Sequence, residues 1–87
     1  MKKIYLVIET VTEDGTFDQK FSKAFTKQED VLKAFKEMKD DAYYSIFNYY
    51  DKDDVDIYDD TEGDFNVEVF DDNFSHSVYI KEIEVVD

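Results

Sequence analysis

Carboxylate side chains crowd one quarter of the chain. Residues 51–72 carry eleven Asp and Glu against a single Lys, so this segment supplies −10 of the net charge of −13. A solvated acidic surface can simply keep a domain soluble and prevent aggregation through its edge strands. Outside catalysis, clustered carboxylates also have two chemical uses: they ligate divalent cations, or they attract cationic groups on a partner. The residues of this segment that we predict to bind a partner are Asp51, Asp53, Asp54, Asp56, Asp59, Asp60, Glu62 and Asp64.

Metal binding is the first of these uses. Counted from Asp51 as in a calcium loop, acids occupy positions one, three and twelve, which are Asp51, Asp53 and Glu62. Position five is Val55, which offers no side-chain oxygen, and position six is Asp56, where such loops need glycine. An EF-hand is therefore disfavoured. Asp51, Asp53 and Glu62 are kept as an alternative Ca²⁺ site without that loop geometry.

The second use follows from spacing. Side chains two apart on a strand project from one face about 6.6 to 6.8 Å apart, comparable to the step between phosphates along one nucleic-acid strand. Asp54 with Asp56, and Asp51 with Asp53 if the strand begins early, would form such rows. The rows favour a binding or inhibitory module that mimics nucleic acid. Its partner would be a basic protein surface, such as that of a nucleic-acid-binding protein.

Composition excludes several other classes. All ten cations are Lys, and the net charge disfavours direct binding to nucleic acid or to an anionic membrane, because both need cationic surface. The apolar run 4–8 is too short for an export signal, and no membrane span is present, so we expect a cytoplasmic protein. Without cysteine there are no disulfides or thiolate metal sites, and no cofactor is expected.

Catalysis is not expected either. The single histidine, His76, lies between Ser75 and Ser77. Adjacent strand residues point to opposite faces, so neither hydroxyl would be held against the imidazole for activation. We predict a surface histidine near a turn. With Gly15 and Gly63 as the only glycines, a Gly-rich phosphate loop is also absent.

Periodicity predicts the elements that position these side chains. Alternating apolar residues flank an Asp-Gly turn, which predicts a hairpin with strands 3–12 and 16–25. A capping box from Thr26 to Glu29 precedes an apolar stripe of helical period, which predicts a helix to about Tyr50. Three apolar segments follow, 55–58, 65–70 and 78–86, separated by turn formers.

The predicted fold is therefore α+β and has two layers. Residues 1–87 form a single domain of order ββαβββ, in which one long helix packs on one face of a mainly antiparallel sheet. On that helix Tyr44 falls outside the apolar stripe, and an exposed Tyr is typical of an interface. Tyr44 is therefore added to the partner-binding residues. A small structural domain that self-associates, as a homodimer, is a further alternative.

Overall fold

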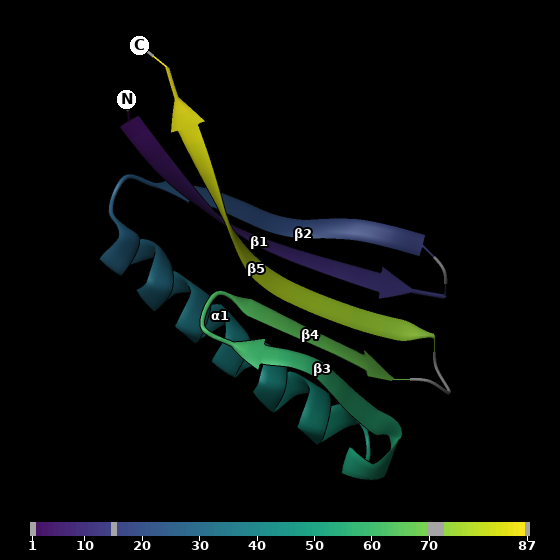
Figure 1. The fold of residues 1–87 in the computed structure, drawn as a ribbon. Coiled ribbons are helices and arrows are strands. Elements are labelled where there is room, and N and C mark those ends of the chain that lie inside the picture. The colour runs from purple at the N-terminus through teal and green to yellow at the C-terminus, as the bar shows by residue number, and fades with distance from the viewer. Residues whose placement is uncertain (1, 15, 70–72, 87) are drawn as a thin grey trace.

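A twisted sheet and one long helix form the two layers of the fold (Figure 1). The computed structural model describes residues 2–14, 16–69 and 73–86, without the side chains of 17–20. Over these residues the order is β1 (Lys2–Glu13), β2 (Thr16–Phe25), α1 (Gln28–Tyr49), a 3₁₀ turn η1 (Lys52–Asp54), β3 (Val55–Thr61), β4 (Asp64–Val69) and β5 (Phe74–Val85). The sheet is antiparallel, with strand order β2-β1-β5-β4-β3. The predicted class and element order are confirmed.

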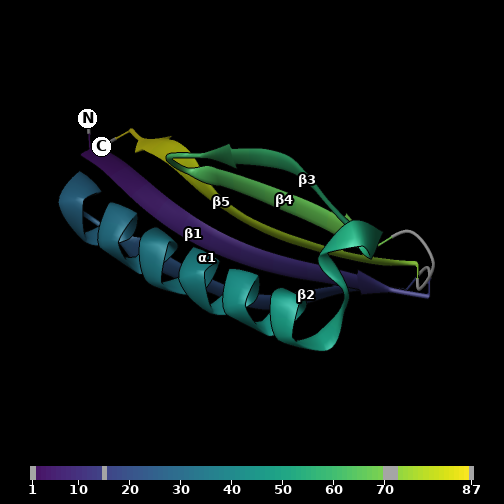
Figure 2. The ribbon, with the colours of Figure 1, turned by 90° about the horizontal axis from the view of Figure 1, so that it is seen from below.

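Side-chain alternation sorts the residues of β1 between the two faces of the sheet. Val7 is fully buried and belongs to the core with Val31 of α1, whereas its neighbours Leu6 and Ile8 project to the other face and are only half-buried. Figure 2 shows why: α1 covers one face, here called the helix face, and none of the described elements covers the other. We call that uncovered side the open face.

Helix α1 packs through a stripe of helical period. Its buried residues, Val31, Phe35, Ala42 and Ile46, are spaced by four, seven and four positions, which places them on one side of the helix. The predicted capping box is wrong. The helix begins one residue later than that box requires, with Lys27 at the N-cap and no side chain bonded to the exposed amides. Two acids in the first turn, Glu29 and Asp30, complement the helix dipole there.

The bounds of the three C-terminal strands differ from the predicted ranges 55–58, 65–70 and 78–86. Strands β3 and β5 are longer than predicted, and β4 begins one residue earlier. β3 continues to Thr61, β5 begins at Phe74, and Phe70 of the predicted strand 65–70 lies outside the described residues. Gly63 makes the turn between β3 and β4 with φ +94°, a backbone conformation that L side chains rarely adopt. Its carbonyl accepts the amide of Ile80 at 2.9 Å, so the turn is fastened to β5.

The core lies between α1 and the middle of the sheet. Phe65, Val7, Val31 and Val78 are 0% exposed, and Phe65 is the largest of them. Because Phe65 lies opposite Val78 in the β4–β5 ladder, it joins the acidic half of the chain to the central strands. The core therefore holds in place the strands that carry the carboxylates.

Replacing Phe65 with alanine is expected to lower the free energy of unfolding by about 3–5 kcal/mol, because it removes a fully buried ring. The matched control is Phe21→Ala, which removes the same ring where it is 43% exposed, and is expected to cost about 1 kcal/mol or less. Urea unfolding followed by circular dichroism measures both. Equal losses in the two variants would contradict this location of the core.

Candidate functional site

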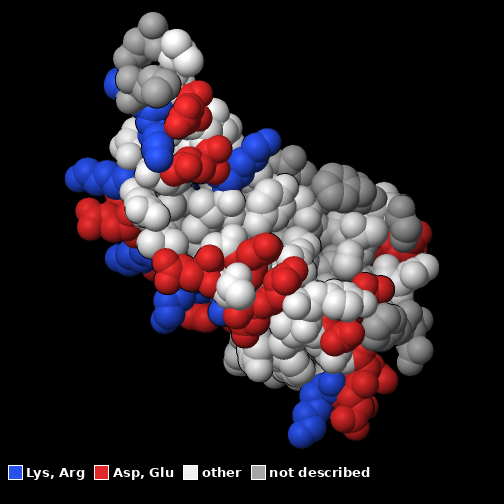
Figure 3. Space-filling model, in the orientation of Figure 1, with Lys and Arg blue, Asp and Glu red and all other residues white. Residues whose placement is uncertain are grey.

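Four carboxylates gather on the open face of β3 and β4. We call Asp56, Asp59, Asp64 and Glu68 the β3–β4 acidic surface. Asp56 lies directly opposite Glu68, and Asp59 lies opposite Asn66, whose neighbour two positions back is Asp64. All four are on the side of the sheet that α1 leaves uncovered, and Figure 3 views that side with acidic side chains gathered over β3 and β4.

A bulge in β3 brings Asp56 and Asp59 to the same face. Residues three apart on a regular strand point to opposite faces. The register between β3 and β4 shifts between Ile57 and Asp59, which inserts one extra residue, Tyr58, and restores the facing of Asp59. The same shift turns Asp60 toward the helix face.

Neutral side chains hold two of these carboxylates in place. The amide nitrogen of Asn66 donates to Asp59 Oδ2 at 2.9 Å and to Asp64 Oδ1 at 2.9 Å. The amide oxygen of Asn66 in turn accepts a hydrogen bond from the Ser77 hydroxyl on β5. One amide therefore bridges two negative charges, and a neighbouring strand fixes its orientation.

The pKa of Tyr58 is raised by the carboxylates around it. Its phenol donates a hydrogen bond to Glu68, which raises the pKa of Tyr58 above 10.0; desolvation and the charges of Glu68 and Asp56 raise it further. The carboxylates oppose the formation of a phenolate beside them. A cation placed at this position would be favoured for the same reason.

Lysine does not neutralise the β3–β4 acidic surface within the part of the chain that the structure describes. The lysine ion pairs there join Lys3 to Glu82, Lys36 to Asp40 and Lys39 to Asp60. None involves one of the four carboxylates. Asp56 and Glu68 in particular face each other across the ladder, an arrangement that costs stability when both are charged.

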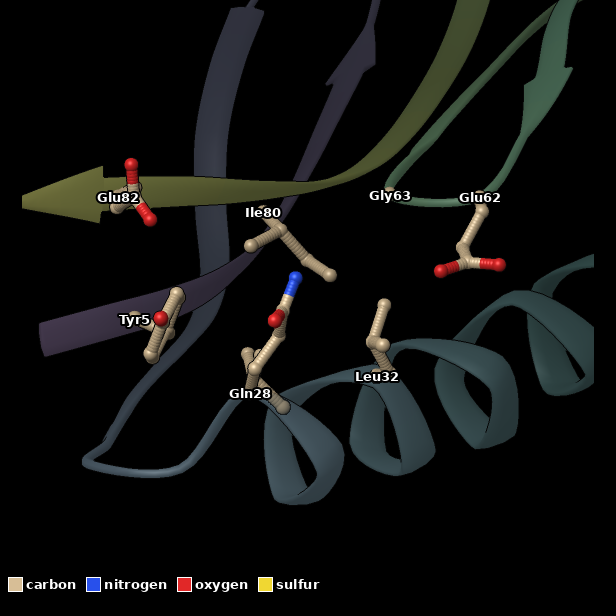
Figure 4. Close-up of a pocket in the computed structure, with 8 residues that line it drawn as sticks. Tyr5, Gln28, Leu32, Glu62, Gly63, Ile80 and Glu82 are labelled. Carbon is tan, nitrogen blue, oxygen red and sulfur yellow. The ribbon is translucent and has the colours of Figure 1, made fainter.

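The remaining predicted partner-binding residues of the acidic segment lie elsewhere. Asp60 forms its ion pair with Lys39 on the helix face, where the Lys39 ammonium also lies 6.0 Å from the centre of the Phe65 ring. Glu62 is on the β3–β4 turn and lines a small cavity of about 330 Å³ beside Gln28 and Leu32 (Figure 4). The structure therefore spreads the predicted set over the two faces of the sheet, the β3–β4 turn and η1.

The structure does not bring the predicted metal ligands together. Asp51 and Asp53 lie at η1, before β3 begins, and Glu62 lies beyond its far end. The seven residues of β3 separate them by about 20 Å at the usual rise per residue. No set of three or more His, Asp or Glu side chains among the described residues is arranged to hold a metal ion. Asp51, Asp53 and Glu62 therefore do not form the alternative Ca²⁺ site in this structure.

The predicted rows of carboxylates on β3 are also wrong. Residues 52–54 form a 3₁₀ turn, so Asp51, Asp53 and Asp54 are not strand residues, and Asp54 does not alternate with Asp56 along a strand. The acids of the open face form a two-dimensional cluster across two strands instead. Asp71 and Asp72, the last acids of the segment, lie outside the described residues.

Tyr44 is 73% exposed, as the helical pattern predicted. It belongs to α1, which lies on the opposite side of the sheet from the β3–β4 acidic surface (Figure 2). Tyr44 and the four carboxylates therefore cannot contact one flat partner surface together.

The contact between the buried His76 and the partly buried Glu9, here called the buried pair, was missed by the sequence analysis. His76 is 6% exposed, and its Nε2 lies 2.8 Å from Glu9 Oε2 on the helix face, so the prediction of a surface histidine is wrong. The signal was present, because His76 alternates with Phe74 and Val78 on β5. Ser77 projects to the open face, as the alternation rule requires.

Comparison with known proteins gives no match: no protein-family model, curated protein or solved structure is significantly similar to the chain. None of the described helices is long and apolar enough to span a bilayer.

The pKa of Tyr58 is expected to lie above its usual value of 10.0 and to fall in a Glu68→Gln variant, because the charged hydrogen-bond acceptor is the largest cause of the shift. A raised folded-state pKa means that this group's contribution to stability is present below pH 10 and lost as pH rises through the folded-state value. Titration of ¹³C-labelled tyrosine by NMR resolves Tyr58 from the other six. An unchanged titration in Glu68→Gln would contradict the contact.

Replacing Glu9 with leucine is expected to lower the free energy of unfolding by about 1–3 kcal/mol, because the buried His76 imidazole loses its partner. Changing both, Glu9→Leu with His76→Phe, is expected to recover part of that loss, since no unpaired polar group remains. Urea unfolding at neutral pH measures the cycle, with exposed Glu84→Leu as the control. Additive losses would show that the two side chains act independently.

Proposed function

We propose that this protein is a non-enzymatic binding module whose β3–β4 acidic surface contacts a basic surface of another protein. The observation that carries the proposal is the carboxylate cluster on the open face, in which Asn66 orders Asp59 and Asp64 and no lysine ion pair to the four acids occurs among the described residues. Uncompensated charges cost stability in the free protein, as the facing pair Asp56 and Glu68 illustrates. A cationic partner removes that cost when it binds.

Pre-organisation supports the same proposal. Binding loses affinity when flexible side chains must be ordered at the interface. Asp59 and Asp64 already share one amide donor, and Ser77 fixes that donor from β5. Complementary charge then steers the encounter and selects basic partners over acidic ones.

The partner we propose is a protein rather than a nucleic acid or a membrane, since both of those carry negative charge. Nucleic-acid mimicry is a narrower function. It was predicted from rows of carboxylates along one strand, and those rows are absent from β3. A basic protein surface of any origin fits a two-dimensional cluster. We therefore propose the broader class.

The absence of catalysis is part of the proposal. The single imidazole, His76, faces Glu9 on the helix face, whereas Ser77 on the same strand projects to the open face and bonds to Asn66. His76 and Ser77 therefore lie on opposite sides of the sheet. The four carboxylates that define the β3–β4 acidic surface include no such pair.

Neutralising the β3–β4 acidic surface is expected to weaken binding of a lysine-rich model peptide on the order of tenfold, because four favourable charge contacts are lost. The variant combines Asp56→Asn, Asp59→Asn, Asp64→Asn and Glu68→Gln. Isothermal titration calorimetry in low salt, with NMR mapping of the shifted amides, measures the effect.

The matched control neutralises four exposed acids elsewhere: Asp30→Asn, Glu37→Gln, Asp40→Asn and Glu84→Gln. Both variants change the net charge from −13 to about −9 at neutral pH. If binding depended on net charge alone, the two would weaken equally, and the proposal would fail. A larger loss in the β3–β4 variant supports a localised surface.

Self-association is a second candidate, favoured by apolar side chains on the open face. Leu6, Ile8 and Tyr79 are half-buried there, and Ile83 is 37% exposed. Salt distinguishes the candidates. Salt screens the repulsion between two copies with net charge −13 and so strengthens a dimer, whereas it weakens binding to a basic partner. Analytical ultracentrifugation at low and high salt is the measurement.

A further inference from the structure

A cavity of about 830 Å³ lies between the C-terminal half of α1 and the strands β1 and β5. This volume is within the range of small-molecule sites. Residues from four elements line it: Val11 of β1, Thr16 of β2, Ile46 of α1 and Phe74 of β5 are among them. The cavity is on the helix side of the sheet, so it is separate from the β3–β4 acidic surface.

The buried pair forms one wall of the cavity. Glu9 and His76 both line it, with the 2.8 Å contact between their side chains. The side chain of Glu9 is 18% exposed and the side chain of His76 is 8% exposed. A carboxylate fixed by a buried partner inside a concave site is a pre-organised acceptor.

Aromatic rings line the cavity from its mouth to that pair. Tyr49 lies 5.8 Å from Tyr50, Tyr50 lies 5.8 Å from Phe74, and Phe74 lies 6.3 Å from His76, all between ring centres. Tyr49 is 85% exposed at the end of the helix. An exposed ring at the mouth of an aromatic-lined cavity offers its face to a cation.

The charge of the lining has one sign. Glu9, Glu13, Asp14 and Asp41 line the cavity, and no lysine is among the described residues that do. These carboxylates do not form a metal site, since no described set of three side chains is arranged to ligate an ion. The combination of carboxylates, ring faces and apolar side chains suits an organic cation.

We propose that this cavity binds a guanidinium group on an aliphatic stem. A guanidinium is planar, stacks on aromatic rings, and donates two parallel hydrogen bonds to a carboxylate. In the cavity the exposed ring of Tyr49 supplies the stacking surface, and Glu9 or Asp41 supplies the carboxylate. The stem contacts the apolar side chains of the lining. The inference stands independently of the proposed function, because the two surfaces are on opposite faces of the sheet.

The first experiment titrates the protein with n-butylguanidinium and, separately, with its neutral isostere n-butylurea, at matched ionic strength and constant pH. His76 is the single histidine, so its Hε1 resonance is a unique NMR reporter on the cavity wall. The expected result is a saturable shift with butylguanidinium, with Kd about 1 mM for so small a ligand, and none with butylurea. Equal shifts with both compounds would overturn the proposal.

Exposed residues at the mouth provide the variants. Tyr49→Ala and Asp41→Asn are each expected to weaken binding roughly fivefold. The matched controls, Tyr44→Ala and Asp30→Asn, remove the same groups from exposed helix positions that do not line the cavity, and are expected to leave Kd unchanged. Equal effects of variants and controls would overturn the site.

Two further arms separate this site from the β3–β4 acidic surface and identify the source of the cation. Shifts confined to the amides of 56, 59, 64 and 68 would overturn the cavity and leave the proposed function standing.

The peptide acetyl-Gly-Arg-Gly-amide is compared with its citrulline counterpart. Tighter binding of the arginine peptide than of butylguanidinium identifies a partner's side chain, and weaker or equal binding identifies a free small cation.

Discussion

The packing of one amphipathic helix against one face of a five-stranded sheet is the constraint on which the rest of the structure depends. The apolar stripe of α1 is buried against the helix face around Phe65 and Val78, and no described element covers the other face. Strand alternation then assigns every second side chain to solvent. The β3–β4 acidic surface is possible because its carboxylates fall on that uncovered side.

The acidic segment accommodates its repulsion in three different ways. Asp60 is neutralised by Lys39 beside the core, and Asp59 and Asp64 share the amide of Asn66. Asp56 and Glu68 remain face to face with no lysine among their described contacts. The first two arrangements reduce the repulsion among the carboxylates of these strands. The repulsion between Asp56 and Glu68 remains, and under our proposal a cationic partner would relieve it.

Negative charge at the surface and negative charge in the cavity differ physically. On the open face the carboxylates are exposed to water and screened by salt, so they act on partners over about a Debye length. Glu9 is instead partly buried with its carboxylate 2.8 Å from His76 Nε2, where a hydrogen bond is directional and less screened. This difference is the reason that we propose a broad basic surface for the open face and a single shaped cation for the cavity.

The element order, the single helix and the location of the charge could all be predicted from the amino-acid sequence, because periodicity and turn residues act over a few neighbouring positions. The sequence also showed that Tyr44 is exposed. Tertiary structure alone decided which carboxylates meet. The bulge at Tyr58 reverses the facing of the acids after it, and η1 removes Asp51, Asp53 and Asp54 from the strand. The Glu9 and His76 pair joins residues 67 positions apart. Such contacts depend on how β1 and β5 align, and that alignment is set by the burial of the whole sheet against α1 rather than by any local pattern.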